Sequence, residues 1–415
     1  MRARHPALPG GSAGPSRREN EGSVIGDSQR GPVDGVLASA VILLVGFGIV
    51  MVYSSSAVFA AREYGDPMHF LIRQSIFAVA GLVAMWIGSR LDYRTLQRVT
   101  YPVLVLAGIG LLLSATGIGT RVGGAARWIR LGPIGIQPSE VAKVGMILYL
   151  SYSLAKKAEK VKTFTIGFLP HVVVAGLFMT ICLGQPDFGS AVIIAFTTFA
   201  LLFVAGARMG YLLGAVLVAV PLAWLAVVSS AYRMERIRVF LDPLRYRLGA
   251  GYQVSESILS FGVGGVTGVG LGDGRQKLMY LPAAHNDFIG AIVGEELGLV
   301  GVLCLLACFA VITWRGVRAA LRAADVYGML VAFGITLLIG MQVLVNFGVT
   351  MGVLPTKGLT LPFVSYGGSS LVLSLFAVGV LLSVSRTTST SVLGEAPGSG
   401  EKPIGVVARG AQAAA

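Results

Sequence analysis

The sequence has 415 residues, of which 54% are hydrophobic and only 13% are charged, and its mean hydropathy is +0.76. Soluble domains carry about 25% charged residues, so this composition excludes an ordinary water-soluble enzyme and predicts a chain solvated mainly by lipid. The formal net charge of +13 would also suit a nucleic-acid-binding protein. We expect no nucleic-acid partner, because the sequence contains no basic soluble domain that could form such an interface.

Taken in chain order, the sequence divides into two tails and one apolar body. Residues 1–33 and residues 387–415 are rich in Gly, Ser, Ala and Pro and predict disordered tails. Residues 34–386 predict a polytopic, all-α membrane domain, because apolar runs of about 20 residues cross a bilayer as helices. The pattern predicts about ten transmembrane helices, at approximately 35–56, 69–89, 99–117, 138–155, 164–183, 188–207, 209–229, 288–313, 327–349 and 361–385.

The basic residues predict the orientation of these helices. An even number of spans places both tails on one side, and the short loops on that side hold basic clusters at 90–98, 156–162 and 315–322. The positive-inside rule makes this side cytoplasmic. The large loop at 230–287, between helices seven and eight, is then extracytoplasmic; it is also basic, but long loops translocate regardless of charge.

The first two outer loops with polar motifs lie before the large loop. Trp128 is flanked by arginines, so it is either an interfacial residue or a ring that stacks on a sugar. Glu140 and Lys143 are spaced to pair on one helix face. In the tight turn at 185–190, Asp187 is placed to cap the helix that follows.

The large loop carries many cations, among them Arg238, Arg275 and Lys277. They are either the ordinary polar residues of a solvated loop or an anion-binding surface. In the second case a lipid diphosphate is a natural ligand, because arginine pairs bidentately with phosphate oxygens. The glycine-rich stretch at 262–274 lacks the strand–helix context of a dinucleotide-binding motif.

The segment 275–298 has the highest density of polar residues. Asp287 lies where the large loop meets span eight, so it is either a helix cap or a general base whose pKa is raised by desolvation. Glu295 and Glu296 fall inside the apolar span, where carboxylates indicate a functional cavity or an internal ion pair. No second histidine or carboxylate is spaced from His285 as zinc ligands are, so we do not predict a metal site there.

The segment 346–370 would be an apolar helix without its prolines and glycines. Such breaks are tolerated at membrane depth where the chain lines a cavity, and Ser365 is a candidate lining residue there. Lys357 lies among these breaks. Its side chain is either a lysine that reaches the membrane surface or a cation directed at phosphate.

Five long motifs occur in one order along the chain, and together they resemble the SEDS family of polytopic shape, elongation, division and sporulation proteins. They are ARWIRLGPIGIQPSE, QPDFGSA, YQVSESILSFGVGGVTGVGLG, YLPAAHNDFIGAIVGEELG and PTKGLTLPFVSYGGSS. The resemblance covers about residues 35–386, and the segments RQKLMYLP and PTKGLTLP favour the division branch over the elongation branch.

The resemblance implies a peptidoglycan glycosyltransferase that polymerises lipid II at the division septum of the bacterial inner membrane, with the active site facing the periplasm. It places the essential acid of the family on Asp287 and its PTKG lysine on Lys357. It also implies a class B penicillin-binding protein as transpeptidase partner, with other division proteins. No resident cofactor is implied, although a divalent cation (Mg²⁺ or Mn²⁺) could share the leaving-group role.

We therefore expect Asp287 to be the base of an inverting transfer that releases polyprenyl diphosphate. The candidate substrate-binding residues are Lys357, Lys277, Arg275, Arg238, Trp128 and His285, and the candidate structural or cavity residues are Glu295, Glu296, Asp187 and Ser365. Two alternatives remain open: a transporter that flips lipid II, and a non-catalytic scaffold for the penicillin-binding partner.

Overall fold

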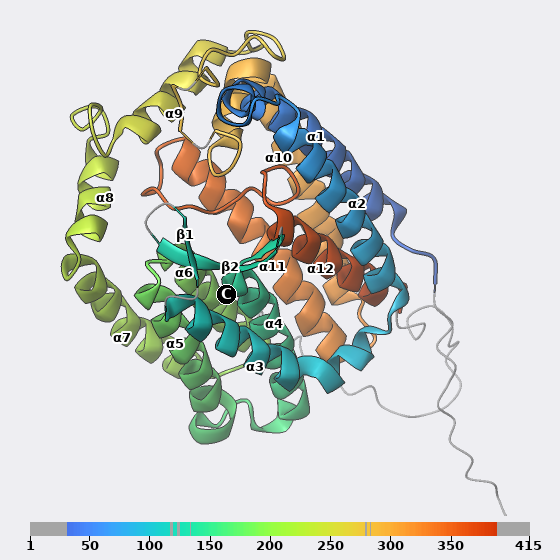
Figure 1. The fold of residues 1–415 in the computed structure, drawn as a ribbon. Coiled ribbons are helices and arrows are strands. Elements are labelled where there is room, and N and C mark those ends of the chain that lie inside the picture. Colours follow the sequence, from blue (N-terminus) through green and yellow to red (C-terminus); the bar gives the residue numbers. More distant parts are fainter. Residues whose placement is uncertain are drawn as a thin grey trace, which may run out of the picture.

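The computed structural model describes residues 31–116, 119–122, 125–132, 134–278, 280–282 and 284–387. Nearly all of the tail residues expected to be disordered lie outside these ranges. The structure is mostly helical, as expected (Figure 1). Its α-helices are α1 (Gly35–Tyr64), α2 (His69–Arg90), α3 (Leu96–Ala115), α4 (Pro138–Lys156), α5 (Leu169–Gly184), α6 (Phe188–Val204), α7 (Met209–Val228), α8 (Ala231–Leu241), α9 (Tyr252–Gly264), α10 (Ile289–Leu321), α11 (Val326–Thr350) and α12 (Gly368–Arg386).

Eight of the described helices are long and apolar enough to cross a membrane. Two of the ten expected spans do not meet that criterion. Helix α6 has only 17 residues. Helix α4 carries Glu140 and Lys143 in its first two turns, and most of its residues are buried. The expected pair between these two side chains is confirmed, with a distance of 2.8 Å between Lys143 Nζ and Glu140 Oε1.

The expectation of a purely α-helical chain was wrong in the connection between α3 and α4. Residues there form a three-stranded antiparallel sheet of β1 (Thr120–Val122), β2 (Ala125–Leu131) and β3 (Ile134–Ile136). The strands are short and lie between two helices, so their local pattern was too weak to stand out from a polar loop. The large loop at 230–287 is also partly helical, since it contains α8 and α9.

Two clusters of buried side chains form the interior. One lies among α1, α2, α10, α11 and α12, and the other among α3, α4, α5 and α6. Helix α7 buries only Leu212 among its residues and runs along the edge of the molecule with α8 (Figure 1).

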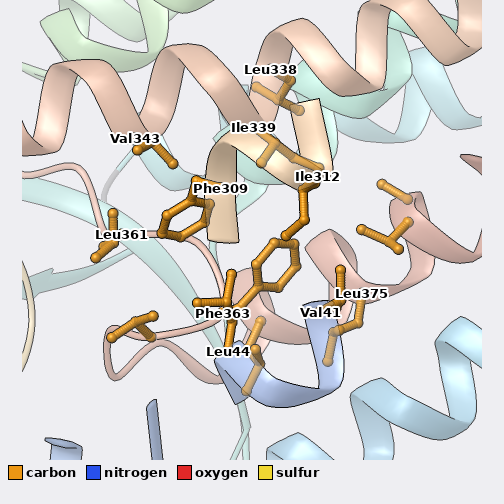
Figure 2. Close-up of a cluster of buried hydrophobic side chains, with 14 of the residues drawn as sticks. Val41, Leu44, Phe309, Ile312, Leu338, Ile339, Val343, Leu361, Phe363 and Leu375 are labelled. Atoms are coloured by element: carbon orange, nitrogen blue, oxygen red, sulfur yellow. The ribbon is translucent and has the colours of Figure 1, made fainter. Parts of the chain in front are cut away.

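The segment between α11 and α12 is irregular, and its second half, residues 359–367, is mostly buried, whereas the sequence predicted helix from 361. Figure 2 shows Phe363 of this segment among side chains of four helices, such as Leu44 and Phe309. The irregular chain reaches this depth because protein surrounds it and because its polar groups are bonded internally, for example Leu361 N–H to Ser365 Oγ at 2.8 Å. The segment thereby joins the buried core to the surface loop that carries Lys357.

Helices α2 and α12 pack closely through small residues. A Cβ atom on Gly379 would overlap the carbonyl oxygen of Met85 and would lie 3.0 Å from Gly88 Cα. Close backbone approach of this kind is a principal source of helix association in lipid, because burial of apolar surface gives little advantage there.

We expect Gly379→Ala to lower the thermal unfolding midpoint of the protein in detergent, because overpacking of this type costs about 1–3 kcal/mol. The matched control is Gly176→Ala on α5, where an added Cβ would meet no atom within 4 Å. Differential scanning fluorimetry compares the two variants. Equal midpoints would show that the α2–α12 contact does not need a glycine.

Candidate functional site

The backbone of the loop that precedes α10 is held at three successive carbonyl groups. His285 O accepts a hydrogen bond from Tyr366 N at 2.9 Å, and Asn286 O accepts one from Ser365 Oγ at 2.7 Å. Asp287 O accepts one from Asn346 Nδ2 at 2.9 Å. These three bonds fix the position of the Asp287 backbone relative to α11 and to the irregular segment before α12.

Asn346 joins this loop to the loop that carries Lys357. Its Nδ2 atom also donates to Leu359 O, at 2.7 Å, so one amide group uses both of its protons on the two loops. Asn346 lies on α11 and is buried, which makes the connection rigid.

The side chain of Asp287 does not cap α10. The cap residue is Phe288, and α10 has no side-chain capping bond, so the capping alternative is wrong. The carboxylate is instead directed at the neighbouring loop, where a Cβ atom on Gly358 would lie 2.9 Å from Asp287 Oδ2. Only glycine leaves this space open. The side chain remains partly exposed, so a ligand can reach it.

Charged groups from three other elements surround Asp287. Burial raises the pKa of Asp287 to about 6; Arg127 and Arg236 oppose this effect, and Asp187 adds to it. An acid with a pKa near 6 is mostly ionised at neutral pH and is still a competent proton acceptor.

Lys357 lies beside two of these charged residues, Arg236 and Asp187. Burial is the main cause that lowers the pKa of Lys357 to about 8, and the neighbouring Arg236 lowers it further. Its Nζ atom stands 4.2 Å from the centre of the Phe188 ring, in a cation–π contact. The lysine is therefore protonated at neutral pH and is held away from free solution.

Arg127 and Arg236 were not singled out by the sequence analysis, yet both contribute charge at Asp287. Arg127, on β2, donates from Nη2 to Pro186 O at 2.5 Å and from Nε to Gln185 O at 3.3 Å. Arg236, on α8, donates from Nη1 to Thr356 O at 2.5 Å. Each guanidinium thus bridges two segments distant in sequence, a relation that no local pattern indicates.

Asp187 caps α6, as the sequence predicted, by accepting a hydrogen bond from Ser190 N at 3.2 Å. Its second oxygen, Oδ2, is buried and has no hydrogen-bond partner among the described residues. It is therefore an available acceptor next to the cations around Asp287.

Lys277 lies in a different environment from the one expected. Its Nζ atom is 2.9 Å from Glu296 Oε1, and both side chains are almost completely buried. Ser54 Oγ, on α1, is 2.7 Å from each oxygen of the same carboxylate. The internal ion-pair alternative thus holds for Glu296, and Lys277 anchors the large loop to α1 and α10.

The other candidates take varied positions. Glu295 accepts hydrogen bonds from the backbone amides of Arg275, at 2.7 Å, and Gln276, at 3.3 Å, so it also fixes the large loop. The side chains of Arg275 and of Arg238, on α8, are exposed, and Trp128 on β2 is partly exposed.

His285 belongs to an aromatic cluster rather than to the charged group. Its ring centre is 4.6 Å from that of Phe70 and 5.7 Å from that of Phe59. Burial lowers the pKa of His285 to about 4, so the imidazole is neutral at physiological pH. No cation is added to the site by this residue.

Within the described residues, no three His, Cys, Asp or Glu side chains are grouped so that they could hold a metal ion. Asp287 and Asp187 supply carboxylates, but arginines lie beside them. A protein-only metal cage does not fit this donor set. Mg²⁺ bound mainly by substrate phosphates needs only one or two carboxylates, so that form of site remains a prediction.

Comparison with known proteins identifies the family to which this chain is similar. The model of the family described as cell cycle protein, which groups FtsW, RodA and SpoVE, matches residues 35–390. A probable peptidoglycan glycosyltransferase FtsW from Geobacter metallireducens is 47% identical over 353 residues, covering 85% of this chain and 94% of that protein. The stage V sporulation protein E of Bacillus subtilis is 41% identical over 354 residues, covering 85% and 97%.

Two solved structures share the fold. A chain from a peptidoglycan synthase complex, described for its coordination of polymerization and crosslinking, is 30% identical with a TM-score of 0.72, and the match covers 85% of this chain and 98% of that one. The rod shape determining protein RodA of Thermus thermophilus is 28% identical with a TM-score of 0.62, over 85% and 97%. The chain therefore belongs to the cell cycle protein family of FtsW, RodA and SpoVE, which is the SEDS family that its motifs resemble.

Proposed function

We propose that this protein is a peptidoglycan glycosyltransferase that polymerises lipid II into glycan strands during cell division. The observation that carries the proposal is the half-buried carboxylate of Asp287, whose backbone is held rigidly and on which the charges of Arg127 and Arg236 act, with Lys357 on the adjoining loop beside Arg236. The relatives named as peptidoglycan glycosyltransferases support the same activity.

The reaction joins two lipid-linked disaccharides. The acceptor 4-hydroxyl oxygen attacks the anomeric carbon of the donor, a new C–O bond forms, and the bond from that carbon to the diphosphate oxygen breaks. Asp287 takes the hydroxyl proton, and polyprenyl diphosphate leaves with the bonding electrons. A single displacement of this kind inverts the anomeric carbon from α to β, and it requires one base and a cationic site for the leaving group.

Lys357, Arg127 and Arg236 are the leaving-group cations in this proposal. Arginine pairs bidentately with phosphate oxygens, and a lysine shielded from water interacts with them more strongly than an exposed one. Lys277 was the sequence-based choice for this role, but its charge is already paired with Glu296, so we assign it to anchoring the loop. A divalent cation would share the role only if the diphosphate supplied most of its oxygen ligands.

The proposed topology has ten membrane spans, α1–α7 and α10–α12, with both termini in the cytoplasm. The basic clusters near Arg94, Lys156 and Arg318 support it, since they lie at the helix ends opposite to Asp287. The catalytic loops then face the periplasm at the septum of the inner membrane. The synthase complex that shares the fold supports a penicillin-binding protein as transpeptidase partner, alongside other division proteins.

We expect Asp287→Asn to reduce glycan polymerisation by about 10²–10⁴-fold, because the amide cannot accept the hydroxyl proton. The measurement is the length and amount of glycan made from labelled lipid II by protein reconstituted in vesicles, with and without the penicillin-binding partner. Asp273→Asn, at an exposed acid of the same loop, is the matched control and should retain activity.

The same variants distinguish the alternatives. Normal polymerisation by Asp287→Asn together with lost lipid II translocation would identify a flippase. Normal polymerisation with intact translocation and a normal partner complex would leave only a scaffold role for this acid.

The pH dependence of kcat/KM should be bell-shaped. Asp287 must be ionised, so activity rises with pH through about 6; Lys357 must be protonated, so activity falls as pH rises through about 8. Lys357→Arg should move the alkaline limb well above 8, since a guanidinium stays charged. If the alkaline limb does not move in this variant, the loss of activity at high pH comes from a group other than Lys357.

Asn346→Ala should lower kcat by about 10–100-fold with little change in KM, because misplacing a catalytic group by about 1 Å has an effect of that size. Steady-state kinetics with lipid II measure the change. Gln342→Ala, one turn earlier on the same buried helix, is the control for general disruption of α11. Equal losses in the two variants would mean that Asn346 acts only through stability.

A further inference from the structure

An exposed pair of stacked rings lies at the connection between α1 and α2. Tyr64, the last residue of α1, and His69, the first residue of α2, have ring centres 4.1 Å apart and ring planes within 2° of parallel. Tyr64 is 53% exposed, and every residue from 61 to 68 is exposed. A flat aromatic surface is therefore presented on the outside of the protein.

This pair is continuous with the loop of the catalytic acid. Phe70 touches both members edge-on, with centres 5.2 Å from His69 and 5.7 Å from Tyr64. Phe70 in turn is 4.6 Å from His285, two residues before Asp287, and stands edge-on to Tyr366 at 5.0 Å. A row of rings thus leads from the surface to His285, in the loop that carries Asp287.

The row of rings and the cations approach Asp287 from different parts of the fold. The cations come from β2, α8 and the Lys357 loop, whereas the rings come mainly from α1 and α2. In Figure 1, α8 and the α1–α2 pair lie on opposite sides of the molecule. The cations around Asp287 suit the diphosphate. On the other side Arg73 is bonded to Tyr366, and the exposed feature is the Tyr64–His69 ring pair, which suits a ligand bound by stacking.

The position of the pair favours a water-soluble ligand. Helix α1 has 30 residues, a length of about 45 Å, whereas the hydrocarbon layer is about 30 Å thick. Its outer end also carries Arg62 and Glu63, and Asp66 follows in the connection. These charges place Tyr64 and His69 in the aqueous layer.

We propose that Tyr64 and His69 form a stacking platform for the glycan strand, a secondary subsite that holds the polymer while further disaccharides are added. This inference rests on the proposed function. The apolar faces of pyranose rings pack on flat aromatic side chains, as apolar surface does generally. Such contacts can form with any sugar of the strand, so they do not require one fixed alignment. A strand held in this way can slide by one repeat after each coupling without leaving the enzyme.

The first test is the length distribution of glycan made by the reconstituted enzyme and its partner from labelled lipid II. Tyr64→Leu keeps an apolar side chain but removes the flat ring, so we expect strands at least threefold shorter, with Tyr64→Phe restoring the wild-type length. Trp224→Leu, at an exposed aromatic residue of α7, is the matched control and should leave the length unchanged. A wild-type length distribution in Tyr64→Leu would reduce the ring pair to a membrane-interface anchor and overturn the proposal.

The second test measures binding without catalysis. Saturation-transfer NMR with a lipid-free, peptide-free GlcNAc–MurNAc tetrasaccharide and the protein in nanodiscs should give at least fivefold weaker binding for Tyr64→Leu than for the wild type. Unchanged tetrasaccharide binding in this variant would overturn the platform, even if strands were shorter, and would point to a protein partner at this surface. Tetrasaccharide binding that depends on Tyr64 in a protein unable to polymerise lipid II would refute the proposed function and leave the glycan site standing.

Discussion

The hydrogen bonds of one buried amide define the geometry of the candidate site. Asn346 donates to Asp287 O and to Leu359 O, and through these two bonds it sets the separation between the acid and the loop of Lys357. Both segments lack regular secondary structure there, so neither could hold its position alone. A rigid helix provides the reference, and the two irregular segments are attached to it. Protein-lined irregular backbone of this kind is what a membrane enzyme needs in order to present polar groups at the edge of lipid.

The electrostatic arrangement follows from that geometry. Burial raises the pKa of Asp287 and lowers the pKa of Lys357, so a fully closed pocket would shift both groups further toward their neutral forms. Partial exposure and the neighbouring guanidinium groups keep the acid ionised. The two arginines are themselves fixed by backbone carbonyl groups, which means that their charges are directed before any substrate arrives. Preorganised charge of this kind stabilises a developing diphosphate without the cost of reorganising the protein.

The sequence was sufficient for the helical membrane architecture, since long apolar runs leave the backbone few alternatives. Local spacing was also sufficient for the Glu140–Lys143 pair and the Asp187 cap, because both depend on residues three positions apart. Local spacing could not predict the partners of Lys277, because these partners lie on α1 and α10, far from Lys277 in the sequence. Arg127 and Arg236 were not chosen as site residues for the same reason: their contribution to the charge at Asp287 depends on where tertiary packing places a strand and a surface helix. The small sheet was missed because its strands are too short to stand out from a polar loop, and the late start of α12 was missed because the irregular residues before it are apolar.

Helix α4 shows how such a bundle can be assembled during synthesis. It contacts α3, α5 and α6, its neighbours in sequence, but also α11, which emerges from the ribosome much later. Until then one flank of a poorly hydrophobic helix would face lipid. Because Glu140 and Lys143 neutralise each other within a single turn, no unpaired charge is left in the bilayer. The pair therefore lowers the free energy of exposing this helix to lipid. The ion pair therefore gives α4 an internal counter-charge that does not depend on the arrival of any other helix.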